Sequence, residues 1–368
     1  MPRGRRCVNT AVARSRPGAL RPWPDVDEGS ELLDKGDRVL VTGGAGMIGS
    51  NLVKRLVARG QHVSVVDNLW RGRKQYLAHE GRFVIDMEQD FHELDLTEAD
   101  VLDPLLDGVS YVYHLAEIVA GVGYVFARQG EVFNRNVKIN TNTIASVRKR
   151  RLKGFVYVGT ACSFPAHKQT GVEAPPLKEE DQYPAAPESA YGWSKLMGEY
   201  EAFLMEKEAA VPVSVLVLHN VYGAPCDYSE ERGQVIPSLV RKAVRHPGEP
   251  FRVWGSGQQG RAFVHVDDVV DALLTAAERG LGRGVIQIGP DVCTPIREIA
   301  EHIVEISGKK IAIEYDPTRP EGDRGRCADY GRARKLLDWR PRKQLRQGLS
   351  ELYGWVQAEE AAAGRARQ

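Results

Sequence analysis

The sequence predicts an α/β protein whose core is a doubly wound parallel sheet, and two observations carry this prediction. From Asp37 onward, short runs of β-branched and aliphatic residues alternate with amphipathic stretches of helical periodicity, such as Ser50–Arg59 and Tyr191–Lys207. The short runs are apolar almost throughout, which is typical of parallel strands with helices on both faces of the sheet. The expected strands are Arg38–Val41, His62–Val66, Phe83–Ile85, Val109–His114, Gly154–Val158 and Val213–His219.

The pattern loosens after Pro225, where shorter and less regular elements follow. The expected elements are helices at Ile236–Arg245 and Asp267–Arg279 and a strand at Phe251–Trp254. The apolar run Val285–Ile288 is expected to return to the main sheet. We therefore expect residues 226–356 to form a smaller C-terminal domain that is interwoven with the sheet domain.

The two ends of the chain differ from the rest in composition. Met1–Trp23 carries six arginines and no acidic residue. This pattern is typical of an organelle transit peptide, but a disordered extension or a start codon assigned too early produces it equally. Residues 1–36 are therefore kept outside the predicted domains. Residues 357–368 are expected to be a flexible tail at a fraying helix end.

Charge and cysteine content exclude several classes of function. Lysine and arginine total 50 against 49 acidic residues, so the net charge of +1 indicates no nucleic acid or membrane partner. No apolar run approaches the roughly 20 residues that span a bilayer. The cysteines show no paired metal-ligand spacing, so no metal is expected, and they favour reduced thiols in the cytoplasm over a disulfide framework. They are Cys7, Cys162, Cys226, Cys293 and Cys327.

A glycine-rich turn joins the first expected strand to the first helix. Residues 43–49 read Gly-Gly-Ala-Gly-Met-Ile-Gly, with Gly43, Gly46 and Gly49 at the spacing of a dinucleotide-binding turn. Such glycines permit a tight turn and a close approach of the backbone to pyrophosphate, and the helix N-terminus, including Met47 and Ile48, offers free N–H groups. We expect a Rossmann-type site here and a mainly NAD-binding domain over residues 37–225.

Acidic residues after the next strands indicate which dinucleotide binds. Asp67 ends the second strand, where a carboxylate accepts hydrogen bonds from a ribose diol and repels a 2′-phosphate. This favours NAD over NADP, although Arg71 and Arg73 leave room for NADP. Asp95-Leu96 follows the third strand, where an adenine contact is expected.

A tyrosine and a lysine four residues apart are the first catalytic candidates. Tyr191 and Lys195 lie one above the other on a helix. A neighbouring ammonium and a positive nicotinamide stabilise a phenolate, which then accepts a hydroxyl proton as hydride leaves. Thr160 lies in a short polar run at the end of a strand between this pair and the glycine turn.

Together these residues resemble the extended short-chain dehydrogenase/reductase superfamily over nearly all of residues 37–355. The segment Thr-Ala-Cys-Ser-Phe-Pro at 160–165 resembles GDP-mannose 3,5-epimerases and, less closely, GDP-fucose synthases. The segment Pro-Glu-Gly-Asp-Arg-Gly-Arg at 320–326 resembles the former. In 4,6-dehydratases an Asp-Glu pair stands where Ala161 and Cys162 stand here, which argues against dehydration.

The resemblance implies a NAD-dependent epimerase of a nucleoside-diphosphate sugar that works through a transient 4-keto intermediate. Tyr191 would act as the base at C4, with Thr160 bonded to the oxygen and Lys195 beside it. The ketone acidifies the protons on C3 and C5, and Cys162, as a thiolate, would remove one of them. Two alternatives remain: an NADPH-dependent 4-keto-sugar reductase like GDP-fucose synthase, and a non-catalytic NAD-binding regulator.

One residue departs from the family's pattern. The partner acid of these epimerases is a lysine or histidine just before a Val-Ile-Pro or Ala-Pro segment, and here Gln234 holds that place. An amide has no useful proton to give. The second acid is therefore Lys168, His219 or a water, or only one centre is inverted, or the reaction is a different one.

Further residues are expected to bind the sugar nucleotide, on the strength of the same resemblance. Arginine guanidinium groups bind phosphate oxygens in a bidentate manner. The expected substrate-binding residues are Gly121, Asn220, Arg261, Arg324 and Arg326. The protein is expected to act as a homodimer in the cytoplasm.

Overall fold

A seven-stranded sheet forms the centre of the chain, and every neighbouring pair in it is parallel. The structure, a computed structural model, describes residues 33–365. The sheet runs in the order β13 (Val285–Ile288), β8 (Val213–Leu218), β7 (Gly154–Thr160), β6 (Tyr111–His114), β1 (Arg38–Thr42), β2 (His62–Val66) and β5 (Phe91–His92). Strand order reverses between β1 and β6, so the predicted Rossmann-type, doubly wound fold is confirmed.

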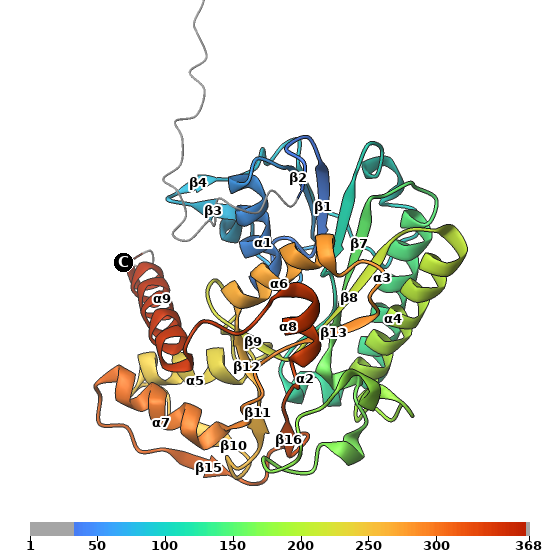
Figure 1. The fold of residues 1–368 in the computed structure, drawn as a ribbon. Helices are drawn as coiled ribbons and strands as arrows, with labels where there is room; N and C mark the ends of the chain where they lie inside the picture. The colour runs from blue at the N-terminus through green and yellow to red at the C-terminus, as the bar shows by residue number, and fades with distance from the viewer. Residues whose placement is uncertain (1–32, 366–368) are drawn as a thin grey trace, which may run out of the picture. The chain divides into compact units, whose positions relative to one another are not determined.

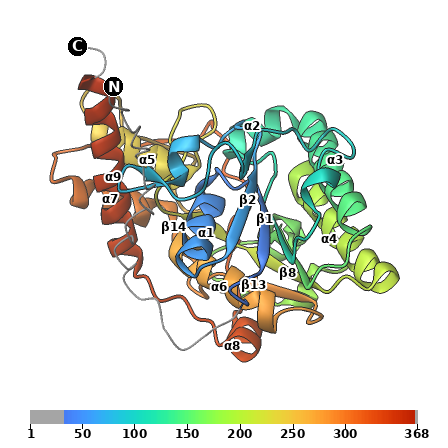
Figure 2. The ribbon, with the colours of Figure 1, turned by 90° about the horizontal axis from the view of Figure 1, so that it is seen from above.

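Helices cover both faces of this sheet because alternate strand residues point to opposite sides. On β1, Val39 and Val41 belong to one apolar core, and Leu40 belongs to another. The first core lies under α1 (Met47–Ala58) and α6 (Val266–Arg279), as Figures 1 and 2 show. The second core lies under helices on the opposite face, which are α3 (Gln129–Val147) and α4 (Ala190–Ala209).

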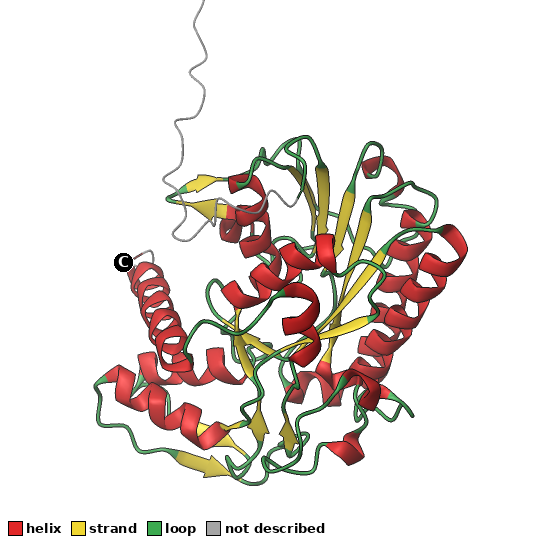
Figure 3. Ribbon diagram, viewed as in Figure 1, coloured by secondary structure: helices red, strands yellow, loops and turns green. Residues whose placement is uncertain are grey.

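Most of the chain after β8 forms a third apolar core with short strands. Figure 3 sets these short strands apart from the long strands of the central sheet. Two parallel pairs are β9 (Asn220–Tyr222) with β12 (Phe263–His265), and β10 (Arg252–Trp254) with β15 (Glu314–Asp316). A three-stranded sheet has the order β14 (Thr294–Pro295), β11 (Gly260–Arg261) and β16 (Gly325–Arg326). The helices here are α5 (Val235–Arg245), α7 (Ile296–Ser307) and α9 (Leu345–Arg365), whereas α8 (Gly331–Leu337) packs on the first core.

The remaining elements are short. They are helix α2 (Val122–Ala127), hairpin strands β3 (Ala78–His79) and β4 (Arg82–Phe83), and 3-10 turns at Lys74–Leu77, Asp103–Leu105, Ala161–Ser163, Ala166–Lys168 and Glu179–Gln182. None of the described helices is long and apolar enough to cross a membrane.

One predicted strand is wrong. The expected strand Phe83–Ile85 does not join the sheet, because Phe83 pairs in the exposed β3–β4 hairpin and β5 takes the place beside β2. The segment expected to be a tail at a helix end is helical as far as Arg365, as the last turns of α9. Within these turns, Glu360 Oε1 lies 2.9 Å from Arg245 Nη2. Residues 1–32 of the expected N-terminal extension, and the last three residues of the tail, lie outside the described residues.

The expectation of reduced thiols is wrong for two of the cysteines. Cys293 and Cys327 form a disulfide, with their Cα atoms 5.3 Å apart. They are 34 positions apart in sequence, and only the folding of β14 and β16 onto opposite sides of β11 brings them together. Cys162 and Cys226 are free thiols, and Cys7 lies outside the described residues.

Candidate active site

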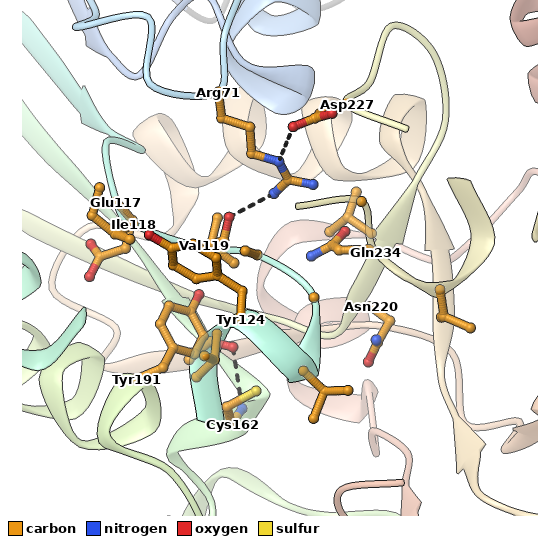
Figure 4. A pocket seen from close by; sticks show the side chains of 18 of the residues that line it. Arg71, Glu117, Ile118, Val119, Tyr124, Cys162, Tyr191, Asn220, Asp227 and Gln234 are labelled. Atoms are coloured by element: carbon orange, nitrogen blue, oxygen red, sulfur yellow. Dashed lines mark hydrogen bonds and ion pairs between the residues drawn. The ribbon is translucent and has the colours of Figure 1, made fainter. Parts of the chain in front are cut away.

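A cavity of about 930 Å³ opens where the strand order reverses, at the carboxyl ends of the central strands. Residues of both the sheet domain and the later short strands line it (Figure 4). The sequence-predicted site residues that line it are Gly43, Gly46, Met47, Ile48, Gly49, Asp67, Asp95, Leu96, Gly121, Thr160, Cys162, Tyr191, Lys195, Asn220, Arg261 and Arg326. Arg324 is the exception: it is exposed and does not line the cavity.

The glycine turn at one end of the cavity is too tight for a side chain at Gly43 or Gly49. A Cβ on Gly49 would lie 2.2 Å from the carbonyl oxygen of Gly43, and Gly43 itself has a φ of +69°. Helix α1 begins directly after the turn, with no side chain capping it and no acid in its first turn. Its N–H groups and positive end therefore suit the pyrophosphate of a dinucleotide.

Asp67 and Arg71, which the sequence placed near the adenosine ribose, point in different directions. Asp67 accepts hydrogen bonds from the N–H of Ala45 at 2.9 Å and of Leu69 at 2.8 Å. Burial raises the pKa of Asp67, and these two bonds oppose that shift. Arg71 donates to the carbonyl of Val119 at 3.0 Å and faces Asp227, with 3.8 Å between Nε and Oδ2 (Figure 4). Its guanidinium is therefore engaged away from Asp67.

The Tyr191–Lys195 helix packs against the polar turn that follows β7. Ser189 caps α4 by accepting a hydrogen bond from the N–H of Gly192 at 3.2 Å. A Cβ on Gly192 would lie 2.1 Å from the carbonyl oxygen of Cys162, so only glycine permits this approach. Thr160 accepts from the N–H of Cys162 at 3.2 Å. The structure thus brings together Thr160, Cys162 and the first turn of α4, which carries Tyr191.

Lys195 has a partner that sequence reasoning missed. Its ammonium donates to Glu117 Oε2 at 3.0 Å, and the two side chains are 3% and 4% exposed. Burial raises the pKa of Glu117 to about 7. Burial, with the nearby charges of Cys162 and Glu117, also raises the pKa of Tyr191, while a hydrogen bond with Thr160 opposes this. The available signal was an acid in the apolar segment after β6, where Glu117 follows Ala116.

Two arginines and an acid gather beside Cys162 at the other end of the cavity. Arg261 on β11 and Arg326 on β16 are register partners. Arg326 Nη1 donates to Asp323 Oδ2 at 2.9 Å, and both of these side chains are 7% exposed. Burial lowers the pKa of Arg326, but its interactions with Cys162 and Asp323 raise that pKa by more, so the net shift is upward.

The structure also tests the two side chains considered as a second acid. Lys168 pairs with Asp181 and lies outside the cavity lining. His219 lines the cavity, but its Nε2 lies 3.1 Å from Gln287 Oε1, and burial lowers its pKa to about 3. Gln287 uses its own amide group to donate to a carbonyl, so Nε2 of His219 must be the donor, and the Nδ1 left over carries no proton. Neither side chain is a proton donor to the cavity.

Comparison with known proteins agrees with this geometry. The model of the NAD dependent epimerase/dehydratase family matches residues 39–289. The GDP-mannose 3,5-epimerase of Arabidopsis thaliana is 30% identical over 323 residues, which is 88% of this chain and 82% of that protein. The chain belongs to the NAD dependent epimerase/dehydratase family.

Other proteins that are similar to this chain have names that give different reactions. UDP-glucuronic acid decarboxylase 2 of Arabidopsis thaliana is 31% identical over 325 residues, covering 86% of this chain and 68% of that protein. The solved UDP-glucose 4-epimerase of Thermotoga maritima superposes with a TM-score of 0.78 at 28% identity, covering 88% of this chain and 99% of that one.

The cofactor of this family is NAD, as the sequence predicted, and the residues present fit it. The uncapped start of α1 suits the pyrophosphate. Asp67, at the end of β2, suits the adenosine ribose, while Tyr191 and Lys195 line the part of the same cavity where the nicotinamide would be.

Proposed function

We propose that this protein is a NAD-dependent epimerase of a nucleoside-diphosphate sugar, similar in reaction to GDP-mannose 3,5-epimerase. The observation that carries the proposal is a free thiol, Cys162, in the same cavity as Thr160, Tyr191 and Lys195. Oxidation and reduction at C4 need only the last three groups. A thiol beside them supplies a base for a carbon next to the ketone.

The chain's own groups divide the work in the following way. NAD, held by the glycine turn and Asp67, would supply reversible hydride transfer at C4 when bound. Tyr191 takes the hydroxyl proton at C4, and Thr160 holds the oxygen in place. The phenol is neutral at rest, because burial raises its pKa, and the positive nicotinamide favours the phenolate when the cofactor is in place. Cys162, as a thiolate, removes a proton from C3 or C5 once C4 is a ketone.

The rest of the cavity supports a sugar nucleotide as the substrate. Gly121, Asn220 and Arg261 line it beyond the catalytic residues, and Arg261 remains our candidate for the diphosphate. Arg326 lies beside Cys162 and is paired with Asp323. Because Arg326 is already paired with Asp323, the carboxylate of a uronic acid bound at Arg326 would lie next to the carboxylate of Asp323 and be repelled by it. The pair therefore favours a neutral hexose as the sugar.

The alternatives differ in what they consume. A 4-keto-sugar reductase would oxidise NADPH, but Asp67 opposes a 2′-phosphate and Arg71 is engaged elsewhere. A non-catalytic regulator would not need the cluster of Thr160, Tyr191 and Lys195. Assaying the purified protein for NADPH consumption separates the reductase from the other two.

The decisive experiment follows ring protons in deuterated water. Wild-type protein given GDP-mannose should place deuterium at C3 or C5, as read by NMR and mass spectrometry. Cys162→Ala should still oxidise and reduce C4 but should lose this exchange. Cys162→Ser should be nearly as poor, because a serine hydroxyl does not offer the accessible anion that a thiol does. Unchanged deuterium uptake in Cys162→Ala would show that the thiol only packs and that another group is the base. Absence of deuterium uptake in the wild type, with this and other nucleotide sugars, would overturn the epimerase itself.

A further inference from the structure

The proposed reaction needs a second proton-carrying group in the cavity, and this inference rests on the proposed function. Inversion requires one group to remove a proton and another to return one to the opposite face of the carbon. Cys162 is one such group. Gln234 is an amide, Lys168 lies outside the cavity, and His219 has no proton to give there. We propose that Glu188, which lines the cavity near Arg261, is the second acid–base group of this enzyme.

The position of Glu188 supports this role. Glu188 directly precedes Ser189, the N-cap of the helix that carries Tyr191. It is exposed, and it lines the cavity. A Cβ on Gly322 would lie 3.9 Å from Oε2 of Glu188 and 3.3 Å from Nη2 of Arg261, so these two side chains converge over that glycine. Glu188 therefore lies at the sugar end, where the arginines are, and not with the residues that hold the cofactor.

A chain of contacts connects Glu188 with Cys162. Glu188 hydrogen-bonds to Asp323, Asp323 accepts from Arg326 at 2.9 Å, and Arg326 bonds to Cys162. In this series of contacts, the Asp323–Arg326 ion pair lies between the two acid–base groups, Cys162 and Glu188. Such an arrangement leaves Cys162 and Glu188 separate, so that each can address the sugar from its own element.

The charged groups that face Glu188 keep a proton on it near neutral pH. Partial desolvation, the negative charge of Asp323 and the hydrogen bond between the two acids raise the pKa of Glu188 to about 7, while Arg326 and Arg261 oppose the shift. A negative charge next to a carboxyl group disfavours its ionisation, so Glu188 holds its proton to higher pH than an isolated glutamate does. A carboxylic acid of this kind is a competent proton donor at physiological pH.

The step balances as follows. The Cys162 thiolate takes a proton from the carbon beside the C4 ketone, and the electrons of that C–H bond form an enolate. Glu188 gives its carboxylic proton to the same carbon from the opposite face, so a new C–H bond forms as the O–H bond breaks. A thiol and a carboxylate remain. Water in the open cavity then removes a proton from the thiol and returns one to the carboxylate.

The test compares exchange with inversion in Glu188→Gln. NAD-loaded enzyme is incubated with GDP-mannose in deuterated water, and deuterium at each ring carbon is measured beside the inverted sugar. Glu188→Gln should lose inversion by roughly 10²–10⁴-fold while Cys162 continues to exchange the proton within a few-fold of wild type. Cys162→Ala should lose both. Glu231→Gln, which removes an exposed cavity acid paired with Arg128, should change neither.

The pH profile supplies a second readout. A proton donor must be protonated, so wild-type inversion should fall as pH rises through about 7, the pKa of Glu188. Asp323→Asn removes a negative charge that raises this pKa, and the fall should therefore move to lower pH. Retained inversion in Glu188→Gln, or an equal loss of exchange and inversion, overturns the proposal. If the wild type neither exchanges nor inverts any nucleotide sugar, the proposed function itself fails, and this inference fails with it.

Discussion

The two ends of the active-site cavity are built in different ways. At the cofactor end, each group follows a strand of the central sheet or lies on the helix after it, as Gly43 and Asp67 do. At the sugar end, Arg261 and Arg326 come from two-residue strands that are far apart in sequence but paired in register. Local strand–turn–helix units thus place the first set, and long-range packing places the second. Substitutions at the two ends should therefore fail in different ways.

The largest expected effect is on chemistry alone. Tyr191→Phe should reduce turnover by roughly 10²–10⁴-fold, the usual contribution of a general base. NAD affinity should stay nearly unchanged, since the groups proposed to hold the dinucleotide are the glycine turn and Asp67. Tyr200→Phe removes an exposed hydroxyl from the same helix and should leave both quantities alone. Steady-state rates and a NAD titration measure the two, and wild-type turnover in Tyr191→Phe would remove Tyr191 from the mechanism.

The cofactor end was predictable because its determinants are contiguous. The glycine spacing, the acid after β2 and the Tyr-Lys pair each occupy a few neighbouring residues, and local geometry fixes what they can do. The central sheet was predicted for the same reason, apart from β5, where the two-residue strand is too short to show a pattern. Even there the error did not disturb the site, since Asp95 and Leu96 still line the cavity.

The sugar end was predictable only through family resemblance. Arg261 and Arg326 line the cavity as expected, but Arg324, two residues away, does not. The acids Glu117, Glu188 and Asp323 were not recognised as members of the site. No local pattern shows that Glu117 meets Lys195, 78 positions later. A single sequence can show an acid in an apolar segment, as at Glu117, but it does not show which side chain that acid will meet.

A disulfide offers a way to disturb the sugar end while sparing the cofactor end. Cys293→Ser should lower the free energy of unfolding by about 2–4 kcal/mol, the usual contribution of a crosslink. Because Cys327 follows Arg326 directly, KM for the sugar nucleotide should rise while NAD affinity stays the same. Denaturant unfolding and NAD titration measure the two responses. A reducing agent should reproduce the effect in wild type and do nothing further to the variant; equal losses at both ends would contradict the separation.

The matching disturbance of the cofactor end is Gly49→Ala. Its Cβ would lie 2.2 Å from a backbone oxygen, so the turn must shift, at a cost of about 1–3 kcal/mol. NAD affinity should fall by a corresponding ~5–150-fold, whereas Arg261 and Arg326 should keep their places. Gly130→Ala adds a Cβ where no atom lies within 4 Å and should leave NAD affinity unchanged. Unaltered NAD binding in Gly49→Ala would mean that the turn does not hold the dinucleotide.

The smallest expected effect is a change of preference between two cofactors. Asp67→Ala removes an acceptor for the ribose diol of NAD and also the negative charge that opposes the 2′-phosphate of NADP. The ratio of the two dissociation constants should therefore move toward NADP by roughly tenfold, about 1.4 kcal/mol. Both carboxylate oxygens accept backbone hydrogen bonds, from Ala45 and Leu69, so alanine also loosens the loop. Asp67→Asn keeps one acceptor oxygen but removes the negative charge, so it separates the effect of the charge from the effect of the lost hydrogen bonds. If the ratio stays constant in both variants, Asp67 only orders the loop after β2, and cofactor choice must lie with residues outside that loop.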